Sequence, residues 1–156
     1  MTSDAPAKTT ALPYSERLLP GPGLFTALLL LVPGVTLVLT PINSSIALPT
    51  AIVVYLLIAL ALILMSPSIR VENGTLMAGR ARIPVSELGD VELLGAEAMR
   101  AAIGTELDAR SYTLVRGWIH RGVRIANTDP EDPAPFWIIT TRHPKRLADA
   151  IAAARG

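Results

Sequence analysis

The stretch that most resembles a binding site is "FWIITTRHPKRLADAI", residues 136–151, where a strand-like run breaks into a helical pattern. Its proline suits the first helical position, so Lys145 and Arg146 fall in the first turn, where the helix dipole disfavours cations. An anion held by the helix N-terminal amides together with Arg142, Lys145 and Arg146 would make this placement favourable. The alternative is an i,i+4 pair between Lys145 and Asp149 that offsets the penalty.

A second group of cations lies in residues 109–128, which contain no acid. If these cations share one face of a strand pair close to a membrane, each would add about 1 kcal/mol of attraction to anionic lipid head groups. The alternative is that they lie on a solvent-facing hairpin and pair with Glu92, Glu97 or Glu106. The four residues concerned are Arg110, Arg116, Arg121 and Arg124.

Other kinds of chemistry find little support in the sequence. The chain has no cysteine, and its two histidines, His120 and His143, lie in no metal-ligand spacing. Gly-x-Ser-x-Gly and phosphate-loop patterns are absent, so we predict no catalytic residue, no cofactor and no metal, and a protein that is not an enzyme. The formal net charge of +1 also argues against nucleic acid as a partner.

The elements that would carry these residues begin with a long apolar segment, because residues 18–69 hold no charged side chain. A polar patch at residues 40–45 divides the segment, which leaves apolar runs at about 24–40 and 46–65. Each run is long enough for a helix that crosses about 30 Å of hydrocarbon. The sequence therefore predicts a transmembrane helical hairpin within residues 20–67, with Pro33 kinking the first helix.

The distribution of cations predicts how the hairpin is oriented. Lys8 and Arg17 precede the first span, and Arg70, Arg80 and Arg82 follow the second, whereas the connecting loop has no charge. The positive-inside rule then places both termini in the cytoplasm of a cell-membrane protein, with residues 1–19 as a separate cytoplasmic segment. The alternative is a cleaved signal peptide with Arg17 in its basic region.

The sequence pattern of residues 68–156 is typical of a small folded domain, which we expect to be cytoplasmic. Alternating apolar positions flank Asn73-Gly74, a strong hairpin signal, and further strand patterns follow. Residues 95–104 suit a short helix, "SYTLVRGWI" and "VRIANTD" read as paired strands, and the last helix carries one apolar face. The prediction is an α+β fold in which a C-terminal helix closes a small antiparallel β domain.

At this level the chain resembles two groups of proteins. The beginning and end of residues 68–156 are similar to bacterial pleckstrin-homology-like domains. The whole layout resembles an actinobacterial family of two-span membrane proteins of unknown function, through a set of short sequence motifs in the same order. These are Tyr14-Ser15-Glu16-Arg17, Gly79 to Pro84, Asp108 to Tyr112, Arg116-Gly117-Trp118, Asp129 to Pro133 and Trp137 to Pro144.

The resemblance implies a pleckstrin-like fold but no catalytic residues. Because folds of that kind host lipid binding, peptide binding and scaffolding alike, function must come from the site. The resulting hypothesis is an integral membrane protein whose cytoplasmic domain binds anionic lipid head groups or a protein partner. The alternative is an accessory subunit of a membrane transport or cell-envelope complex that recognises another membrane protein, and a membrane-bound enzyme is a more distant third.

Overall fold

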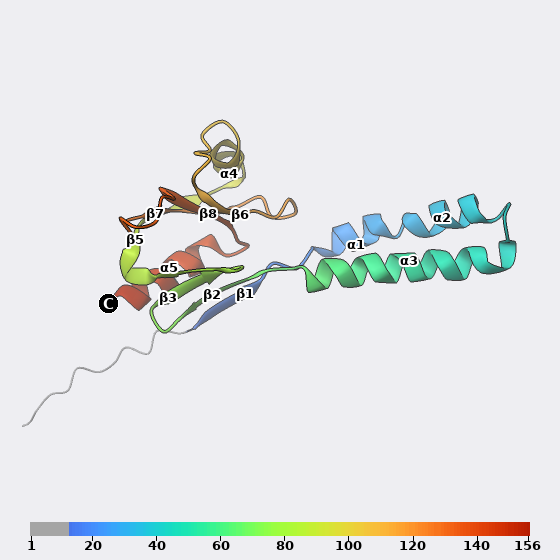
Figure 1. Cartoon of the computed structure of the whole chain (residues 1–156), viewed down its shortest axis with the longest axis horizontal. Helices are drawn as coiled ribbons and strands as arrows, with labels where there is room; N and C mark the ends of the chain where they lie inside the picture. Colours follow the sequence, from blue (N-terminus) through green and yellow to red (C-terminus); the bar gives the residue numbers. More distant parts are fainter. Residues whose placement is uncertain (1–12) are drawn as a thin grey trace, which may run out of the picture. The chain divides into compact units, whose positions relative to one another are not determined.

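The computed structural model describes residues 13–156, which form two compact units. One unit is residues 18–67, and the other is residues 13–17 together with residues 68–156. Figure 1 shows the helices α1, α2 and α3 of the first unit and the strands and helices of the second. Each unit is built by its own sequence pattern, apolar throughout in the first and alternating in the second.

The first apolar run forms a broken helix, with α1 at Pro22–Leu28 and α2 at Leu31–Leu39. The break lies one turn before Pro33, whose missing N–H cannot bond to the Leu29 carbonyl. That carbonyl accepts instead from the Val32 N–H at 3.0 Å. The Thr36 hydroxyl donates to the Val32 carbonyl at 2.7 Å, so a side chain also reinforces the turn after the break. The predicted kink is confirmed, displaced by one turn.

The second apolar run is a single helix, α3 at Ser44–Leu64. Asn43 caps it, because the Asn43 Oδ1 accepts from the Ser45 N–H at 3.0 Å. Pro49 lies inside the helix, beyond its first turn.

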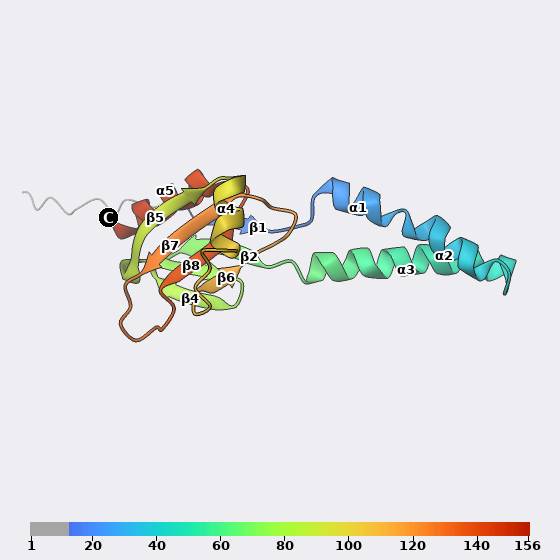
Figure 2. The same cartoon turned by 90° about the horizontal axis from the view of Figure 1, so that it is seen from above.

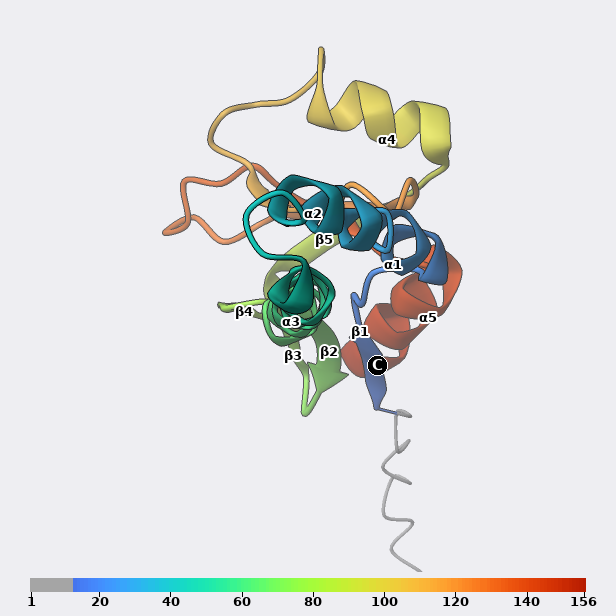
Figure 3. The same cartoon turned by 90° about the vertical axis from the view of Figure 1, so that its right-hand side faces the viewer.

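Helices α2 and α3 lie side by side, as Figure 3 shows, and α3 buries the small residues Ala47 and Ala51. Most of the exposed large apolar side chains in the described chain lie on these helices. By length and composition, residues Pro22–Leu39 and Ser44–Leu64 are each able to cross a membrane.

The first sheet is an antiparallel meander in the order β1-β2-β3-β4. Its strands are β1 Tyr14–Arg17, β2 Ser68–Glu72, β3 Thr75–Ala78 and β4 Ala81–Pro84. Asn73 and Gly74 have φ values of 50° and 71°, as the tight turn between β2 and β3 requires. This confirms the hairpin that Asn73-Gly74 predicted.

Strand β1 corrects the predicted separate N-terminal segment. It comes before the apolar hairpin yet pairs with β2, which comes after it, in the register Tyr14↔Val71 and Glu16↔Ile69. The sequence "YSER" alternates, so Tyr14 and Glu16 share one face of the sheet. The structure therefore builds the domain from both sides of the hairpin, and Lys8 lies outside the described residues.

The second sheet has the order β5-β7-β8-β6, with a 3-10 turn, η1 at Val85–Glu87, leading into it. Figure 2 looks onto this sheet from above. Strands β7 and β5 are antiparallel neighbours, and so are β7 and β8, but β6 runs parallel to β8. The strand bounds are β5 Leu88–Leu94, β6 Tyr112–Leu114, β7 Gly122–Asn127 and β8 Phe136–Thr140.

The parallel pair contradicts the predicted hairpin between "SYTLVRGWI" and "VRIANTD" and the wholly antiparallel sheet. Strand β6 ends at Leu114, where the Thr140 hydroxyl donates to the Leu114 carbonyl and accepts from the Arg116 N–H, both at 3.1 Å. These bonds hold the chain against β8 at the point where a hairpin partner of β7 would continue. Residues 115–121 then return to β7 without forming a strand.

Two helices cover the second sheet on opposite faces, which Figure 1 shows clearly. Helix α4 at Ala96–Ile103 packs Met99 and Ala102 against Leu94 and Ile138. Helix α5 at Pro144–Arg155 buries Leu147 and Ile151 and contacts β1 and β2 as well as β5 and β7. The predicted α+β class, with two apolar helices first and a closing C-terminal helix, is confirmed, and the pleckstrin-like form stays a prediction.

Candidate functional site

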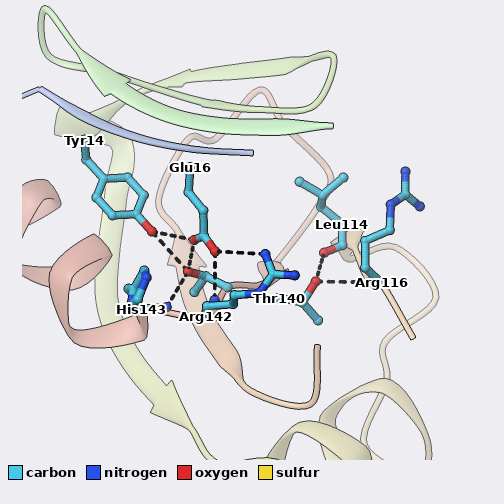
Figure 4. A network of polar contacts seen from close by, with 8 residues as sticks. Tyr14, Glu16, Leu114, Arg116, Thr140, Arg142 and His143 are labelled. Carbon is cyan, nitrogen blue, oxygen red and sulfur yellow. Dashed lines mark hydrogen bonds and ion pairs between the residues drawn. The ribbon is translucent and has the colours of Figure 1, made fainter. Parts of the chain in front are cut away.

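The junction between β8 and α5, where sequence analysis predicted an anion, contains one from the chain itself. The Glu16 carboxylate of β1 accepts hydrogen bonds from the Arg142 N–H at 3.0 Å and from the Tyr14 hydroxyl at 2.6 Å, as Figure 4 shows. The Thr141 hydroxyl also donates to Glu16, and the Arg142 guanidinium lies 4.0 Å from it. Only 9% of the Glu16 side chain is exposed.

This network makes the junction a closed structural contact. The Thr141 hydroxyl accepts from the His143 N–H at 3.0 Å, so the backbone that leads into α5 is fixed by Glu16 and Thr141 together. Burial raises the pKa of Tyr14 above its usual range, and the hydrogen bond to Glu16 raises it further. Of the three cations predicted to bind a ligand here, Arg142 therefore faces Glu16, while Lys145 and Arg146 are exposed.

The four arginines of residues 109–128 have different surroundings. Arg110 pairs with Asp108 at 3.0 Å, and its side-chain hydrogen bond lowers the pKa of Asp108. Arg124 pairs with Glu92 at 2.7 Å and Glu106 at 3.4 Å and lies over the Phe136 ring. For Arg124, the alternative of pairing with Glu92 or Glu106 is therefore the correct one.

The other two arginines of this group lie on the segment between β6 and β7. Arg116 is half-buried, its backbone N–H bonds to Thr140, and its guanidinium donates to the Val115 carbonyl at 3.4 Å. Arg121 is exposed, and its carbonyl accepts from the Thr141 N–H at 3.0 Å. That bond brings the Arg121 backbone beside the segment that leads into α5.

A pocket of about 330 Å³ lies at the same end, bordered by the first residues of α4 and by the first residue of α5. Arg121 and His120 line it together with Pro144 and with two leucines of β5. Helix N-termini favour anions, and neither α4 nor α5 has a side-chain cap. The full lining is Leu93, Leu94, Gly95, Ala96, His120, Arg121 and Pro144.

The two tryptophans of the domain differ in their burial. Trp137 is buried in β8, with its ring 4.4 Å from the ring of Tyr112. The Tyr112 hydroxyl donates to the Ala78 carbonyl of β3 at 2.7 Å, so this aromatic pair links the two sheets. Burial also raises the pKa of Tyr112. Trp118 is half-buried in the segment between β6 and β7.

Sequence analysis missed Glu16 and Tyr14 as members of this region. Two signals were available: the alternation in "YSER", and the strand pattern that begins directly after the apolar hairpin at Ser68. A chain that leaves and re-enters a hairpin at neighbouring points can pair the two flanking segments. Within residues 13–156, no group of three or more histidine, aspartate and glutamate side chains is arranged to hold a metal ion.

The fold and the site define a class of protein: an α+β domain interrupted, after its first strand, by an apolar helical hairpin. The family described as "Protein of unknown function (DUF3093)" matches residues 13–151, and the chain belongs to that family. The match begins next to β1 and ends within α5, so it spans both units. No curated protein and no solved structure matches the chain.

Proposed function

We propose that the chain is a two-span membrane protein whose cytoplasmic domain binds the phosphate of anionic lipid head groups without catalysing a reaction. The observation that carries the membrane part is the pairing of β1 with β2 across the apolar hairpin. Two paired strands must lie on the same side of a bilayer, so the segment between them has to cross an even number of times. The two apolar helices Pro22–Leu39 and Ser44–Leu64 fit that requirement.

The same pairing argues against a cleaved signal peptide. Cleavage after the first apolar helix would remove β1 along with it, and the Glu16 carboxylate would leave the junction before α5. Cations flank the hairpin at both ends, with Arg17 before it and Arg70 after it, and this supports a cytoplasmic location for the domain.

The ligand part of the proposal is supported by the charge that the junction leaves exposed. Glu16 accepts hydrogen bonds inside the junction, whereas three exposed cations remain: Arg121, which lines the pocket, and Lys145 and Arg146, which lie in the first turn of α5. A phosphate group suits such a set, because it accepts several hydrogen bonds and carries negative charge. Arg110, Arg116, Arg124 and Arg142 then serve the structure through the contacts described above.

The test uses the full chain in neutral nanodiscs, because β1 belongs to the domain and a fragment starting at Ser68 would lack it. Binding of a monomeric short-chain phosphatidylglycerol and of inorganic phosphate is measured by calorimetry. The variants are Arg121→Glu, Lys145→Glu and Arg146→Glu, and the matched control is Arg100→Glu on the exposed side of α4.

Each variant should weaken phosphatidylglycerol binding by about fivefold, the equivalent of about 1 kcal/mol per cation, and the control should not. Binding of inorganic phosphate alone would identify a free phosphate as the ligand. No binding of either probe by the wild type, or an equal loss in Arg100→Glu, would contradict the ligand part of the proposal.

The second candidate function is an accessory subunit of a membrane transport or cell-envelope complex. It is favoured by the apolar side chains that α2 and α3 expose on the faces turned away from each other. Extraction in a mild detergent, followed by mass spectrometry of co-purifying chains, distinguishes the two. A stoichiometric partner that survives in Lys145→Glu would favour the subunit, and its absence would favour the lipid-binding domain.

A further inference from the structure

The outer face of the first sheet carries a row of cations that sequence analysis used only to orient the hairpin. In the register of the sheet, Arg70 of β2 lies opposite Met77 of β3, and Met77 lies opposite Arg82 of β4. Ser15 of β1 lies opposite Arg70 on the other side. Residues directly opposite each other point to the same face, so these side chains form one surface. We call Arg17, Arg70, Met77 and Arg82 the basic face.

The other face of the same sheet is buried and, apart from Tyr14 and Glu16, apolar, which fixes the direction of the basic face. Ile69 and Val71 of β2 alternate with Arg70, and both are buried, as are Leu76 and Ile83 in the next two strands. A shift of one residue in register would bury the arginines and expose these apolar side chains. The outward direction of Arg70 and Arg82 is therefore fixed by the core.

The arginines of β2 and β4 on this face have no acidic partner in the described domain. Arg70 and Arg82 are exposed, and neither forms a salt bridge within residues 13–156. Arg80, in the turn between β3 and β4, adds a further exposed cation at the edge. Glu72 is the one acid on the described strands of this face, and it lies at the far end of β2, next to the Asn73-Gly74 turn. The arginines of the second sheet differ, because Arg124 has two carboxylate partners.

The chain segments that join the basic face to the apolar helices are short. Arg17 lies five residues before Pro22, where α1 begins, and Arg70 lies six residues after Leu64, where α3 ends. An extended chain covers at most about 3.5 Å per residue, so both arginines stay within about 20 Å of a helix end. If the hairpin spans a bilayer, as proposed above, these cations are held near its charged surface, where the potential acts over about one Debye length.

We propose that the basic face is a membrane-docking surface that binds the head groups of anionic phospholipids in the bilayer that holds the hairpin. Charge complementarity and the short connections to both helices favour lipid over a soluble acidic protein as the occupant. Met77, at the centre of the row, is half-buried among the cations and gives the face an apolar contact for the interfacial region. This surface is separate from the end of the domain that carries Lys145, and it rests on the proposed function only in that the hairpin crosses the membrane.

The test uses single-cysteine labelling, for which the chain is suited because it has no cysteine of its own. Met77→Cys is labelled with a fluorophore, and the full chain is placed in nanodiscs that carry a head-group quencher. One set of discs contains phosphatidylcholine alone, and the other contains phosphatidylcholine mixed with phosphatidylglycerol. The control label is Ala98→Cys, on the exposed side of α4.

We expect stronger quenching of the label at position 77 in the mixed discs than in the neutral ones, and loss of the difference at high salt. Arg70→Gln with Arg82→Gln should reduce quenching to the neutral level, whereas Arg70→Lys with Arg82→Lys should keep it, because the attraction depends on charge. The label at position 98 should respond to neither. Circular dichroism of each variant checks that the sheet is intact.

Equal quenching at position 77 in both kinds of disc, or quenching unchanged by the two glutamine substitutions, would overturn the docking surface. Lys145→Glu separates this result from the ligand proposal, since it should weaken binding of soluble phosphatidylglycerol by about fivefold and leave quenching at position 77 unchanged. A chain that fails to co-elute with the discs would overturn the membrane-spanning proposal, and the docking surface with it.

Discussion

The two faces of the first sheet differ in where their charged side chains lie and in whether those side chains have partners. On the inner face, the single carboxylate of Glu16 is almost fully buried and has donors from Tyr14, Thr141 and Arg142. On the outer face, Arg70 and Arg82 are exposed and have no acidic partner in the described chain. The inner face uses its charge to hold β1 to the start of α5, whereas the outer face leaves its charge available to something outside the domain.

This difference shows why a cation in a sequence is a poor guide to a binding site. Arg142 and Arg124 looked as suitable as any other cation, and both are held by acids from distant parts of the chain. A buried charge left without its partner costs far more than an exposed pair gains. Substitutions on the inner face should therefore affect stability strongly, and substitutions on the outer face should affect it hardly at all.

The largest effect is expected for Glu16→Ala. Removal of the carboxylate leaves the Arg142 N–H and the Thr141 hydroxyl without their acceptor in a site that water hardly reaches. We expect a loss of about 3 kcal/mol, because unsatisfied buried groups cost about 1–3 kcal/mol each. The thermal midpoint of the full chain in detergent, followed by near-ultraviolet circular dichroism, should fall by about 10 °C or more.

Glu16→Gln is the control for this prediction. It keeps one acceptor oxygen and the size of the side chain, so it should recover part of the lost stability. Hydrogen exchange should also show β1 opening before the second sheet in Glu16→Ala. Equal midpoints for wild type and Glu16→Ala would mean that the contact between β1 and α5 does not hold the domain together.

A smaller effect is expected for Tyr14→Phe, which removes the hydroxyl that donates to Glu16. The loss at neutral pH should be about 1 kcal/mol, as for a typical hydrogen bond. Burial raises the pKa of Tyr14, so above pH about 10 the unfolded phenol ionises while the folded one stays neutral. Wild-type stability should then fall as pH rises above about 10.

The pH series itself checks that assignment. The stability of Tyr14→Phe should decline less steeply above pH about 10 than that of the wild type, because the variant lacks one of the tyrosines whose pKa is raised by folding. Some decline should remain, since burial also raises the pKa of Tyr112. Identical slopes in wild type and variant would show that Tyr14 does not contribute to the alkaline loss.

How much of this could be read from the sequence depends on the range of the contacts involved. The apolar hairpin, the Asn73-Gly74 turn and the closing helix follow from local patterns, and all three are present. The pairing of β1 with β2 depends on two segments about fifty residues apart, and period-two alternation does not say which strand lies beside which. The parallel pairing of β6 with β8 was not predicted, for the same reason.

At the candidate site, too, the local pattern could be predicted and the contact between distant segments could not. The sequence correctly marked the break at Thr141 and Arg142 as a strand-to-helix junction. It offered an external anion there as one interpretation, whereas the anion at the junction in the structure is a carboxylate of the chain. It did not identify Glu16 as that anion, because the carboxylate arrives from the other side of the hairpin. The pairing of Arg124 with Glu92 was open as an alternative, and only the register of β5 against β7 decides it.

Arg124→Gln tests a paired arginine of the second sheet. The side chain is 28% exposed and contacts two carboxylates and the Phe136 ring. We expect a loss of about 0.5–1 kcal/mol, near the upper end for partly exposed pairs, since the stem also loses its packing. The thermal midpoint should fall by a few degrees, and less at high salt, where the wild-type pair is screened. A salt-independent loss would assign the effect to packing alone.

The smallest effect on stability is expected for Arg70→Gln, on the outer face of the first sheet. Its guanidinium is exposed and no carboxylate lies across from it, so its removal should change the free energy of unfolding by less than about 0.5 kcal/mol. Like-charge repulsion from Arg82, two strands away, should even fall slightly. The measurement is the thermal midpoint beside that of Arg124→Gln, in the same detergent at low salt. A loss as large as that of Arg124→Gln would mean that Arg70 has a structural partner, and its charge would then not be free to act on a membrane surface.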